Sequence, residues 1–503
     1  MELAFEEKKM PYLSPVVRQV LYQEETAESI VPDSSPDMAR IVDCSGRVLL
    51  RSKDCRDGSA TISGGVQAEI LYQAEEENGL RSLHVYLPFS ARVENTELTG
   101  SASVLCDCRI RSIDARMLNS RKAMVRVNLG CAVTAYEPAE QSIWTLPEAR
   151  EDLQVKRRTV PLFLMKTTGE KSFVISEENE LPSGRAAVAE IYRWDTLLEL
   201  TEKKLVGSRA VFKGNATVRL LYRGVDDSFN NWSFQVPFSQ YAELDQEIEA
   251  EDVTIALALT GAELEKDSAE ECRSLMLTLN VLAQCLAGEQ EQVEIIEDLY
   301  STQQQVTPQM TTLRATSLLD QQNLHQGVRE TVSAPVSQTL DTVVYLDFPT
   351  QERSGEQVRV VASAQVSTLY LDEQSQVQSV QRRVDASCET QLHPDCELHA
   401  QAMLTADTYA SPVPEGAEIR FAVDFCLESL AVEEIAMVCG AEATDREETG
   451  EECPSVIIRA VTQTESLWIL AKSCNTTVEA ICKANGLQED APIEGTMLLI
   501  PMR

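Results

Sequence analysis

One short strand pattern occurs three times in the chain, and it constrains the fold more than any other feature. The three copies end at Tyr72, Tyr222 and Tyr370. Apolar and polar residues alternate in each copy, which predicts a β-strand with one buried face and one solvent-exposed face. The predicted buried positions are Val66, Ala68, Ile70 and Tyr72, then Ala216, Val218, Leu220 and Tyr222, then Ala364, Val366 and Tyr370. The predicted solvent-exposed positions are Gln67, Glu69, Thr217, Arg219, Gln365 and Ser367.

The copies are evenly spaced, because 150 residues separate the first two tyrosines and 148 separate the last two. Two landmarks keep this spacing: Ile30-Val31-Pro32 and Leu181-Pro182 precede the first two copies, and Pro88-Phe89 and Pro237-Phe238 follow them. The third copy keeps only Ala334-Pro335 before its strand. A repeat of this length indicates tandem domains of one type, since solenoid repeats recur every ~20–50 residues.

The charge of the chain narrows the classes of partner. The sequence has 80 Asp and Glu residues against 44 Lys and Arg residues, a formal net charge of −36. Such a surface repels nucleic acid and anionic lipid and favours basic protein partners. No run of about 18 apolar residues occurs, so we expect no membrane span. The 43% hydrophobic content argues against wholesale disorder.

Targeting and redox signals point to the cytoplasm. The first ten residues carry five charged side chains and no apolar core of a signal peptide, so we expect no Sec export. The fourteen cysteines fall singly inside apolar patterns. We interpret them as buried free thiols in a reducing compartment.

The last 48 residues differ in kind from the repeats. Ile457-Ile458 begins a short strand, and Ser466–Ser473 is expected to be a helix. Thr476 and Glu479 form a T-x-x-E capping box for a second helix, which Gly486 ends. An apolar strand from 497 to 500 completes a βααβ unit.

We therefore predict a mainly β chain with three tandem related β-sandwich-like domains followed by a small βααβ domain. Short helices are expected at 16–22 and 148–155. The predicted order is a leader (1–30), a first domain (31–136), a connector (137–171), a second domain (172–300), a connector (301–327), a third domain (328–440), an acidic linker (441–455) and the C-terminal domain (456–503).

The residues that carry chemistry in enzymes are scarce. The sequence lacks phosphate-binding glycine loops, nucleophile elbows and zinc-protease motifs. His393, Cys396 and His399 have metal-ligand spacing, but no second cluster completes a site. We interpret the many carboxylates as side chains on solvent-exposed faces of the domains. We predict a protein that is not an enzyme, with no catalytic residues, no metal and no cofactor.

The C-terminal unit resembles the LysM family through Glu465–Lys472, Asn475–Val478, Asn485–Leu487 and Leu498–Pro501. That resemblance implies a βααβ fold and a groove between two loops that usually binds N-acetylglucosamine-containing glycans. The chain departs from the family with Gln463-Thr464-Glu465 in place of a Gly-Asp-Thr loop. The expected groove residues are Thr464, Glu465, Ser466, Leu467, Asn485, Gly486 and Leu487. Trp468 has two interpretations, a core aromatic or an anchor that faces a partner.

Upstream, the Pro32–Met38 segment and the Gly64-Gly65…Pro88-Phe89 pattern resemble the SPOCS domain. The whole arrangement is similar to the SipL family of endospore-forming bacteria. This resemblance implies a mother-cell protein at the forespore surface that helps to assemble the spore coat. Its implied partner is the coat morphogenetic ATPase SpoIVA or an equivalent.

Three functional hypotheses stay open at this point. The first is a non-enzymatic scaffold that docks a coat protein through the LysM-like domain. The second is a carbohydrate-binding protein attached to peptidoglycan or cortex. The third and weakest is a hydrolase that uses the LysM-like domain for targeting. Exposed strand edges of the β-domains also offer sites for strand addition by partners.

Overall fold

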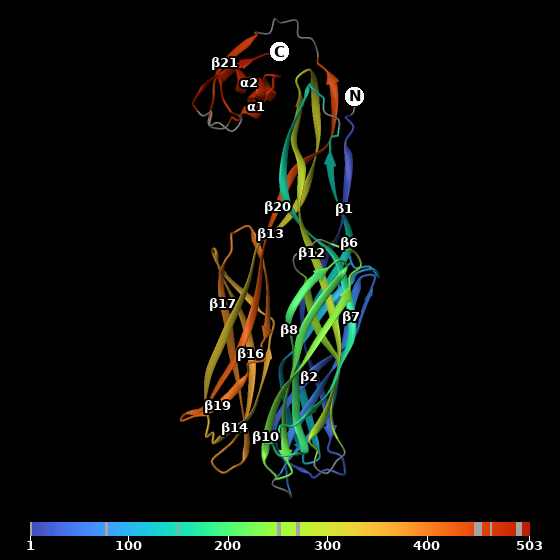
Figure 1. Cartoon of the computed structure of the whole chain (residues 1–503), viewed down its shortest axis with the longest axis vertical. Coiled ribbons are helices and arrows are strands. Elements are labelled where there is room, and N and C mark those ends of the chain that lie inside the picture. Colours follow the sequence, from blue (N-terminus) through green and yellow to red (C-terminus); the bar gives the residue numbers. More distant parts are fainter. Residues whose placement is uncertain are drawn as a thin grey trace.

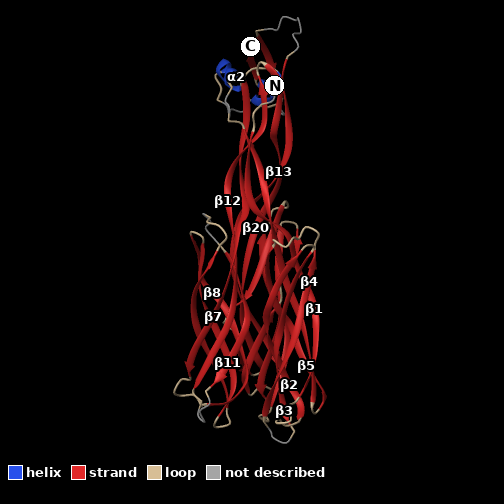
Figure 2. Ribbon diagram, turned by 90° about the vertical axis from the view of Figure 1, so that its right-hand side faces the viewer, coloured by secondary structure: helices blue, strands red, loops and turns tan. Residues whose placement is uncertain are grey.

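The computed structural model shows an elongated, almost entirely β molecule (Figure 1). A three-lobed body lies at one end, a slender stalk rises from it, and a small helical module lies at the tip of the stalk (Figure 2). The structure describes residues 3–75, 79–147, 150–248, 253–267, 272–446, 455–462, 465–488 and 495–502. The predicted fold class is confirmed.

Each lobe is a sandwich of two antiparallel sheets, and the three lobes repeat one topology. In the first unit the sheets have the orders β2-β3-β4 and β1-β6-β5, and in the second β8-β9-β10 and β11-β12-β7. The third unit has β14-β16-β15 with β17 added, and β13-β20-β18 with β19 added. We call the first sheet of each pair the repeat sheet, because its central strand (β3, β9 or β16) is the repeated one.

The strand bounds follow this division. The first unit contains β1 (Glu6–Ile30), β2 (Met38–Arg56), β3 (Ser59–Ala74), β4 (Leu80–Glu94), β5 (Ser103–Asn119) and β6 (Lys122–Thr145). The second contains β7 (Leu153–Glu180), β8 (Val188–Val206), β9 (Arg209–Gly224), β10 (Phe229–Glu243), β11 (Thr254–Lys266) and β12 (Ser274–Ser301). The third contains β13 (Gln304–Ser333), β14 (Gln338–Leu346), β15 (Thr350–Ser354), β16 (Gln357–Leu371), β17 (Val377–Gln391), β18 (Cys396–Leu404), β19 (Tyr409–Val413) and β20 (Gly416–Asp445).

The Pro-Phe landmark has a packing cause. Phe89 lies opposite Gly64 in the β3–β4 pair, and a Cβ on Gly64 would meet its ring at 2.6 Å. In the second unit a Cβ on Gly214 would meet the ring of Phe238 at 2.5 Å. The ring therefore covers a bare backbone, a pairing that stabilises glycine in strands. The third unit has no such ring at this register, and there the glycine is replaced by Ala362.

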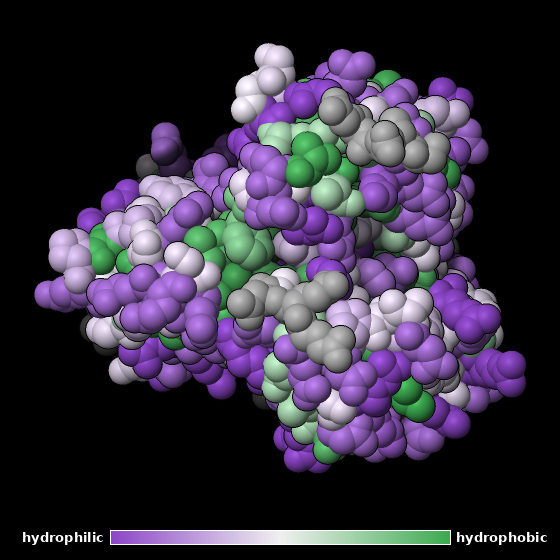
Figure 3. Space-filling view, turned by 90° about the horizontal axis from the view of Figure 1, so that it is seen from below, coloured by the Kyte–Doolittle hydropathy of each residue, from purple (hydrophilic) through white to green (hydrophobic). Residues whose placement is uncertain are grey.

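The prediction that one face of the repeated strand is exposed to solvent is wrong in part. Glu69, Thr217 and Ser367 are buried, because the three repeat sheets face one another at the centre of the body. Seen from below, three lobes meet around a centre where apolar side chains gather (Figure 3). The residues that precede the repeated tyrosines pack into one cluster shared by all three units (Leu71, Leu221 and Leu369).

The stalk consists of the strand pairs β1–β6, β7–β12 and β13–β20, which continue beyond the sandwiches (Figure 1). Each unit contributes one pair, and apolar side chains from all three pairs meet inside. This stalk core contains Met10, Ile143, Val160, Leu162, Leu164, Val293, Ile295, Leu313, Ala315, Ile435 and Met437.

The stalk corrects several local expectations. Residues 16–22 lie in strand β1 and not in a helix. The helix expected at 148–155 is also wrong in its described part, where β7 begins at Leu153. The stretches 137–171 and 301–327, expected as connectors, carry strands. The predicted domain boundaries stay predictions, and the strand pairing favours units that include these strands. Most of the predicted acidic linker lies outside the described residues.

The C-terminal module has the predicted βααβ order, with β21 (Val456–Ala460), α1 (Leu467–Ser473), α2 (Val478–Asn485) and β22 (Met497–Pro501). Ser466 caps α1 by accepting a hydrogen bond from the backbone N–H of Ile469. The cap of α2 is Thr477 and not Thr476, which is buried. Gly486 ends α2 in the left-handed conformation, as expected (φ = 65°).

Candidate functional site on the C-terminal module

A buried ionic cluster lies at the centre of the body, and it is the first candidate for chemistry. Arg193 of β8 donates hydrogen bonds to Asp43 of β2 (2.6 Å) and to Asp341 of β14 (2.5 Å). These three residues follow β-bulges at the same register of their repeat sheets. One residue from each unit therefore forms a single triad, which joins the three lobes.

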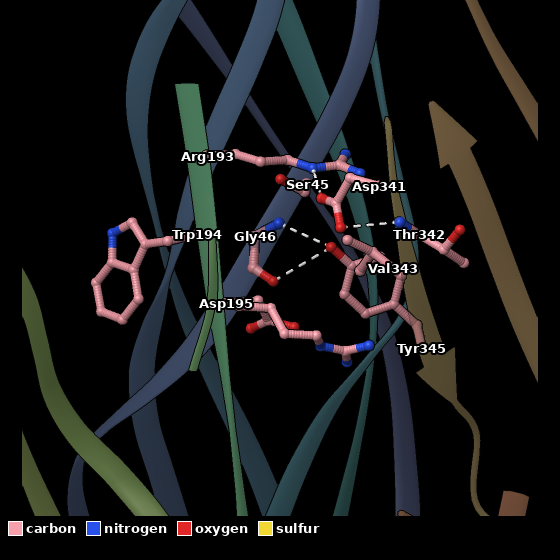
Figure 4. A pocket seen from close by; sticks show the side chains of 10 residues that line it. Ser45, Gly46, Arg193, Trp194, Asp195, Asp341, Thr342, Val343 and Tyr345 are labelled. Atoms are coloured by element: carbon pink, nitrogen blue, oxygen red, sulfur yellow. Dashed lines mark hydrogen bonds and ion pairs between the residues drawn. The ribbon is translucent and has the colours of Figure 1, made fainter. Parts of the chain in front are cut away.

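A small cavity lies beside this triad (Figure 4). The hydroxyl of Tyr345 accepts a hydrogen bond from the N–H of Gly46 and donates one to its carbonyl oxygen. Asp195 points into the same region, and burial raises its pKa. The cavity volume is about 10 Å³, which holds about one water molecule. The cluster is thus an interface between units and not a substrate site.

A second polar cleft, of about 460 Å³, lies between the first and second units. Its lysine, Lys53, contacts Glu170 and donates to Gln284 (2.8 Å). The Gln284 amide in turn pairs with both backbone groups of Cys106. These polar groups are engaged in holding the two units together, so they offer little to a ligand.

The histidines and cysteines do not assemble into a site among the described residues. No three His, Cys, Asp or Glu side chains gather there in a metal-binding arrangement. His399 contacts Arg18, and burial together with this cation lowers the pKa of His399 to about 4. The cysteines in the described part of the chain are free thiols, most of them buried. No helix in that part is long and apolar enough to cross a bilayer.

The predicted groove loops of the C-terminal module start side by side. Val461 pairs through its backbone with Thr496 (3.0 Å) and with Gly495 (3.3 Å), so the loops that follow β21 and precede β22 emerge together. Glu465 accepts hydrogen bonds from the N–H and hydroxyl of Thr462, which lower its pKa. The carboxylate of Glu465 also contacts Arg459 of β21, so it is engaged within the module.

Other expected groove residues have structural roles. Leu467 is buried in the module core. The side chain of Asn485 accepts a hydrogen bond from the N–H of Leu499 (2.8 Å) and donates to its carbonyl oxygen (2.7 Å). Ser466 and Gly486 are helix caps, and Leu487 packs against the core. Thr464 lies outside the described residues. Ligand contact by these seven residues stays a prediction.

A clasp between the module and the stalk is the feature that sequence reasoning missed. Asp298 of β12 accepts hydrogen bonds from the indole N–H of Trp468 (2.8 Å) and from Lys472 (2.6 Å). Tyr300 packs edge-on against Trp468, with ring centroids 4.9 Å apart, and its hydroxyl donates to the carbonyl of Thr476. Burial and the Asp298 carboxylate raise the pKa of Tyr300 to about 12. The module core thus includes a residue of the stalk.

Trp468 packs against the core, as the first interpretation has it, and its contact with a partner protein stays a prediction. Its indole N–H also anchors the module to the stalk of the same chain, a contact that neither interpretation included. No local pattern marks Asp298 or Tyr300 as contacts, since they lie about 170 residues upstream of α1.

The fold and the module together define a class: a protein of several β-domains that carries a small βααβ binding module. A family model described as the SPOCS domain of SipL matches residues 37–118 and 187–263, and a LysM domain model matches residues 461–501. The chain thus contains two SPOCS segments and a C-terminal LysM domain. The third β-unit lies outside both SPOCS segments.

These matches agree with the resemblance found in the sequence. SPOCS and LysM are non-catalytic domain families, and together they suggest a sporulation-related protein with a LysM binding module. No curated protein and no solved structure matches the chain.

Proposed function

We propose that this protein is a non-enzymatic scaffold of the spore envelope that docks a coat morphogenetic protein, the ATPase SpoIVA or an equivalent, through its LysM domain. The proposal places it in the mother-cell cytoplasm at the forespore surface. The clasp on the stalk tip is the observation that carries it. Asp298 and Tyr300 hold the LysM domain in one orientation at the end of the molecule away from the three-lobed body.

The rest of the molecule supports a mechanical role. The body buries one ionic triad in the interface between its units, and the stalk is made of strands from all three units. Such a structure holds a binding module at a fixed distance and orientation, which suits assembly better than catalysis. The carboxylate of Glu465 is engaged by Thr462 and Arg459 and is not available to sugar hydroxyls, which favours a protein partner over a glycan.

A binding experiment with the full chain separates the protein partner from the glycan. The immobilised chain is exposed to SpoIVA from the same organism and, in parallel, to chitin-type oligosaccharides. The full chain is needed because Tyr300 belongs to the core of the LysM domain. We expect SpoIVA to bind and the oligosaccharides not to bind.

A matched pair of variants assigns the binding to the LysM domain. Leu467→Glu puts a charge into the LysM core and is expected to abolish binding. Met310→Glu puts the same charge on an exposed stalk position and is expected to leave binding unchanged. Binding of the oligosaccharides alone would replace the scaffold with the carbohydrate-binding alternative.

A further inference from the structure

The two-stranded sheet of the LysM domain has an exposed face made only of apolar side chains. The side chains of Val456, Ile458, Met497 and Leu499 are 51%, 64%, 70% and 42% exposed. Ile458 lies directly opposite Leu499 in the β21–β22 pair, so these residues share one face of the sheet. The opposite face contributes Leu498 and Ile500 to the buried core. Contiguous apolar surface on a soluble protein marks an interaction site.

One edge of this sheet is covered, and among the described residues no backbone pairs with the other edge. Leu499 directs its backbone N–H and carbonyl to Asn485 of α2, on the side of β22 away from β21. In an antiparallel pair, two residues directly opposite one another point their N–H and carbonyl groups either both toward the other strand or both away from it. Ile458 therefore directs its N–H and carbonyl away from β22, along the outer edge of β21.

The size of the apolar face argues against a second copy of this chain as its occupant. The four side chains expose roughly 400 Å² in all, about half of the ~800 Å² that each partner buries in a standard interface. Two copies would also bring together two chains that each carry a formal net charge of −36. The occupant must add contacts beyond the apolar face and must carry the opposite charge.

We propose that the outer edge of β21 is a docking edge for an extended segment of a basic partner protein, which adds a third strand to the sheet. Backbone hydrogen bonds to Ile458 supply affinity in this mode of recognition, and alternate apolar side chains that continue the exposed face supply specificity. Lys and Arg residues flanking that segment complement the acidic chain. The inference rests on the proposed function, and it moves the contact from the groove loops to the sheet edge.

A glycan does not fit this surface. The face contains no aromatic ring on which a sugar can stack, and its side chains have no hydrogen-bond donors or acceptors for hydroxyl groups. An apolar, alternating strand segment matches both the face and the edge.

Two substitutions at one position test the backbone and the side chain separately. Ile458→Pro removes the outward N–H, and proline is tolerated at such an edge position because that N–H takes no part in the existing ladder. Ile458→Lys keeps the N–H but replaces the apolar side chain with a charge that protects strand edges. Leu319→Lys, at a position of similar exposure on β13 of the third unit, is the matched control.

The readout is the Kd of each full-length variant for SpoIVA. Hydrogen exchange of α1 measures whether the LysM domain is folded, and Ile457→Pro, which breaks the inner ladder, provides the unfolded reference. We expect at least a tenfold rise in Kd for both Ile458 variants with α1 still protected, and a change under twofold for Leu319→Lys.

The outcomes separate the inference from the function on which it rests. Unchanged affinity in Ile458→Pro while the unsubstituted chain binds SpoIVA would overturn strand addition and leave the scaffold intact. If Ile458→Lys lost affinity and Ile458→Pro did not, strand addition would also be overturned, because the contact would then depend on side chains only. Absence of SpoIVA binding by the unsubstituted chain would instead overturn the proposed function.

Discussion

Replacing Arg193 with methionine tests whether the ionic triad holds the three units together. The side chain of Arg193 is 2% exposed, and that of its partner Asp43 is 0% exposed. Without the guanidinium, Asp43 keeps only the hydroxyl of Ser367 as a hydrogen-bond donor from another unit. Removing one partner of a buried ion pair costs about 3–5 kcal/mol, because an uncompensated charge stays buried. Asp341 is 16% exposed and is partly relieved by water, so we expect about 3–4 kcal/mol.

Native-state hydrogen exchange is the appropriate assay, because a chain of several domains does not unfold in one step. We expect faster exchange in β2, β8 and β14 together, since the triad takes one residue from each. The triple variant Asp43→Asn, Arg193→Met, Asp341→Asn removes all three charges of the triad and is expected to recover most of the loss. Lys9→Met, at an exposed ion pair, is the control and is expected to cause no change. A loss under about 1 kcal/mol for Arg193→Met, or faster exchange in β8 alone, would refute the reasoning.

Three further predictions concern the tip and the third unit. Asp298→Ala removes the acceptor for Trp468 and Lys472, so we expect about 1.5–3 kcal/mol less protection of α1 in hydrogen exchange; unchanged protection would mean that the clasp does not form in solution. Ile481→Glu places a charge in the LysM core and is expected to unfold that domain while circular dichroism still reports folded β-units. His399 stays neutral in the folded state to about pH 4, whereas the unfolded chain takes up its proton near pH 6.5, so stability of the third unit should fall as the pH drops through that window. His399→Gln should flatten this part of the stability curve.

The repeated strands were predictable because their apolar faces pack within their own units. Alternation in a single strand reports which side chains point into the local core. It does not reveal that the other face is covered by a neighbouring unit, since a buried Glu69 paired with Arg47 and a solvated glutamate look alike in the sequence. The sequence nevertheless contained a usable signal. Asp43, Arg193 and Asp341 are separated by 150 and 148 residues, the spacings of the repeated tyrosines, and their charges alternate in sign.

The stalk and the clasp were harder to predict for a different reason. Each of the strands β1, β7 and β13 contributes only a few apolar side chains to the stalk core, because six strands share this narrow core. Their sequences therefore show a weak apolar pattern. The segment that contains Leu313 and Ala315 is otherwise rich in Gln and Thr, which is typical of a linker when no partner strand is known. Its pairing with β20, more than a hundred residues away, depends on the assembled body and not on local pattern.

The arrangement around the centre also shows what the third unit contributes to the rest of the fold. Without it, Arg193 would lose Asp341, Gly46 would lose the hydroxyl of Tyr345, and Asp43 would lose Ser367. The stalk would lose one of its three strand pairs, and with it Leu313 and Ile435 of the core that supports β12. Because β12 carries the clasp to the LysM domain, the position of the binding module depends on all three units at once. A partner at the tip would therefore be held by the whole molecule, and not by one module in a series of independently moving domains.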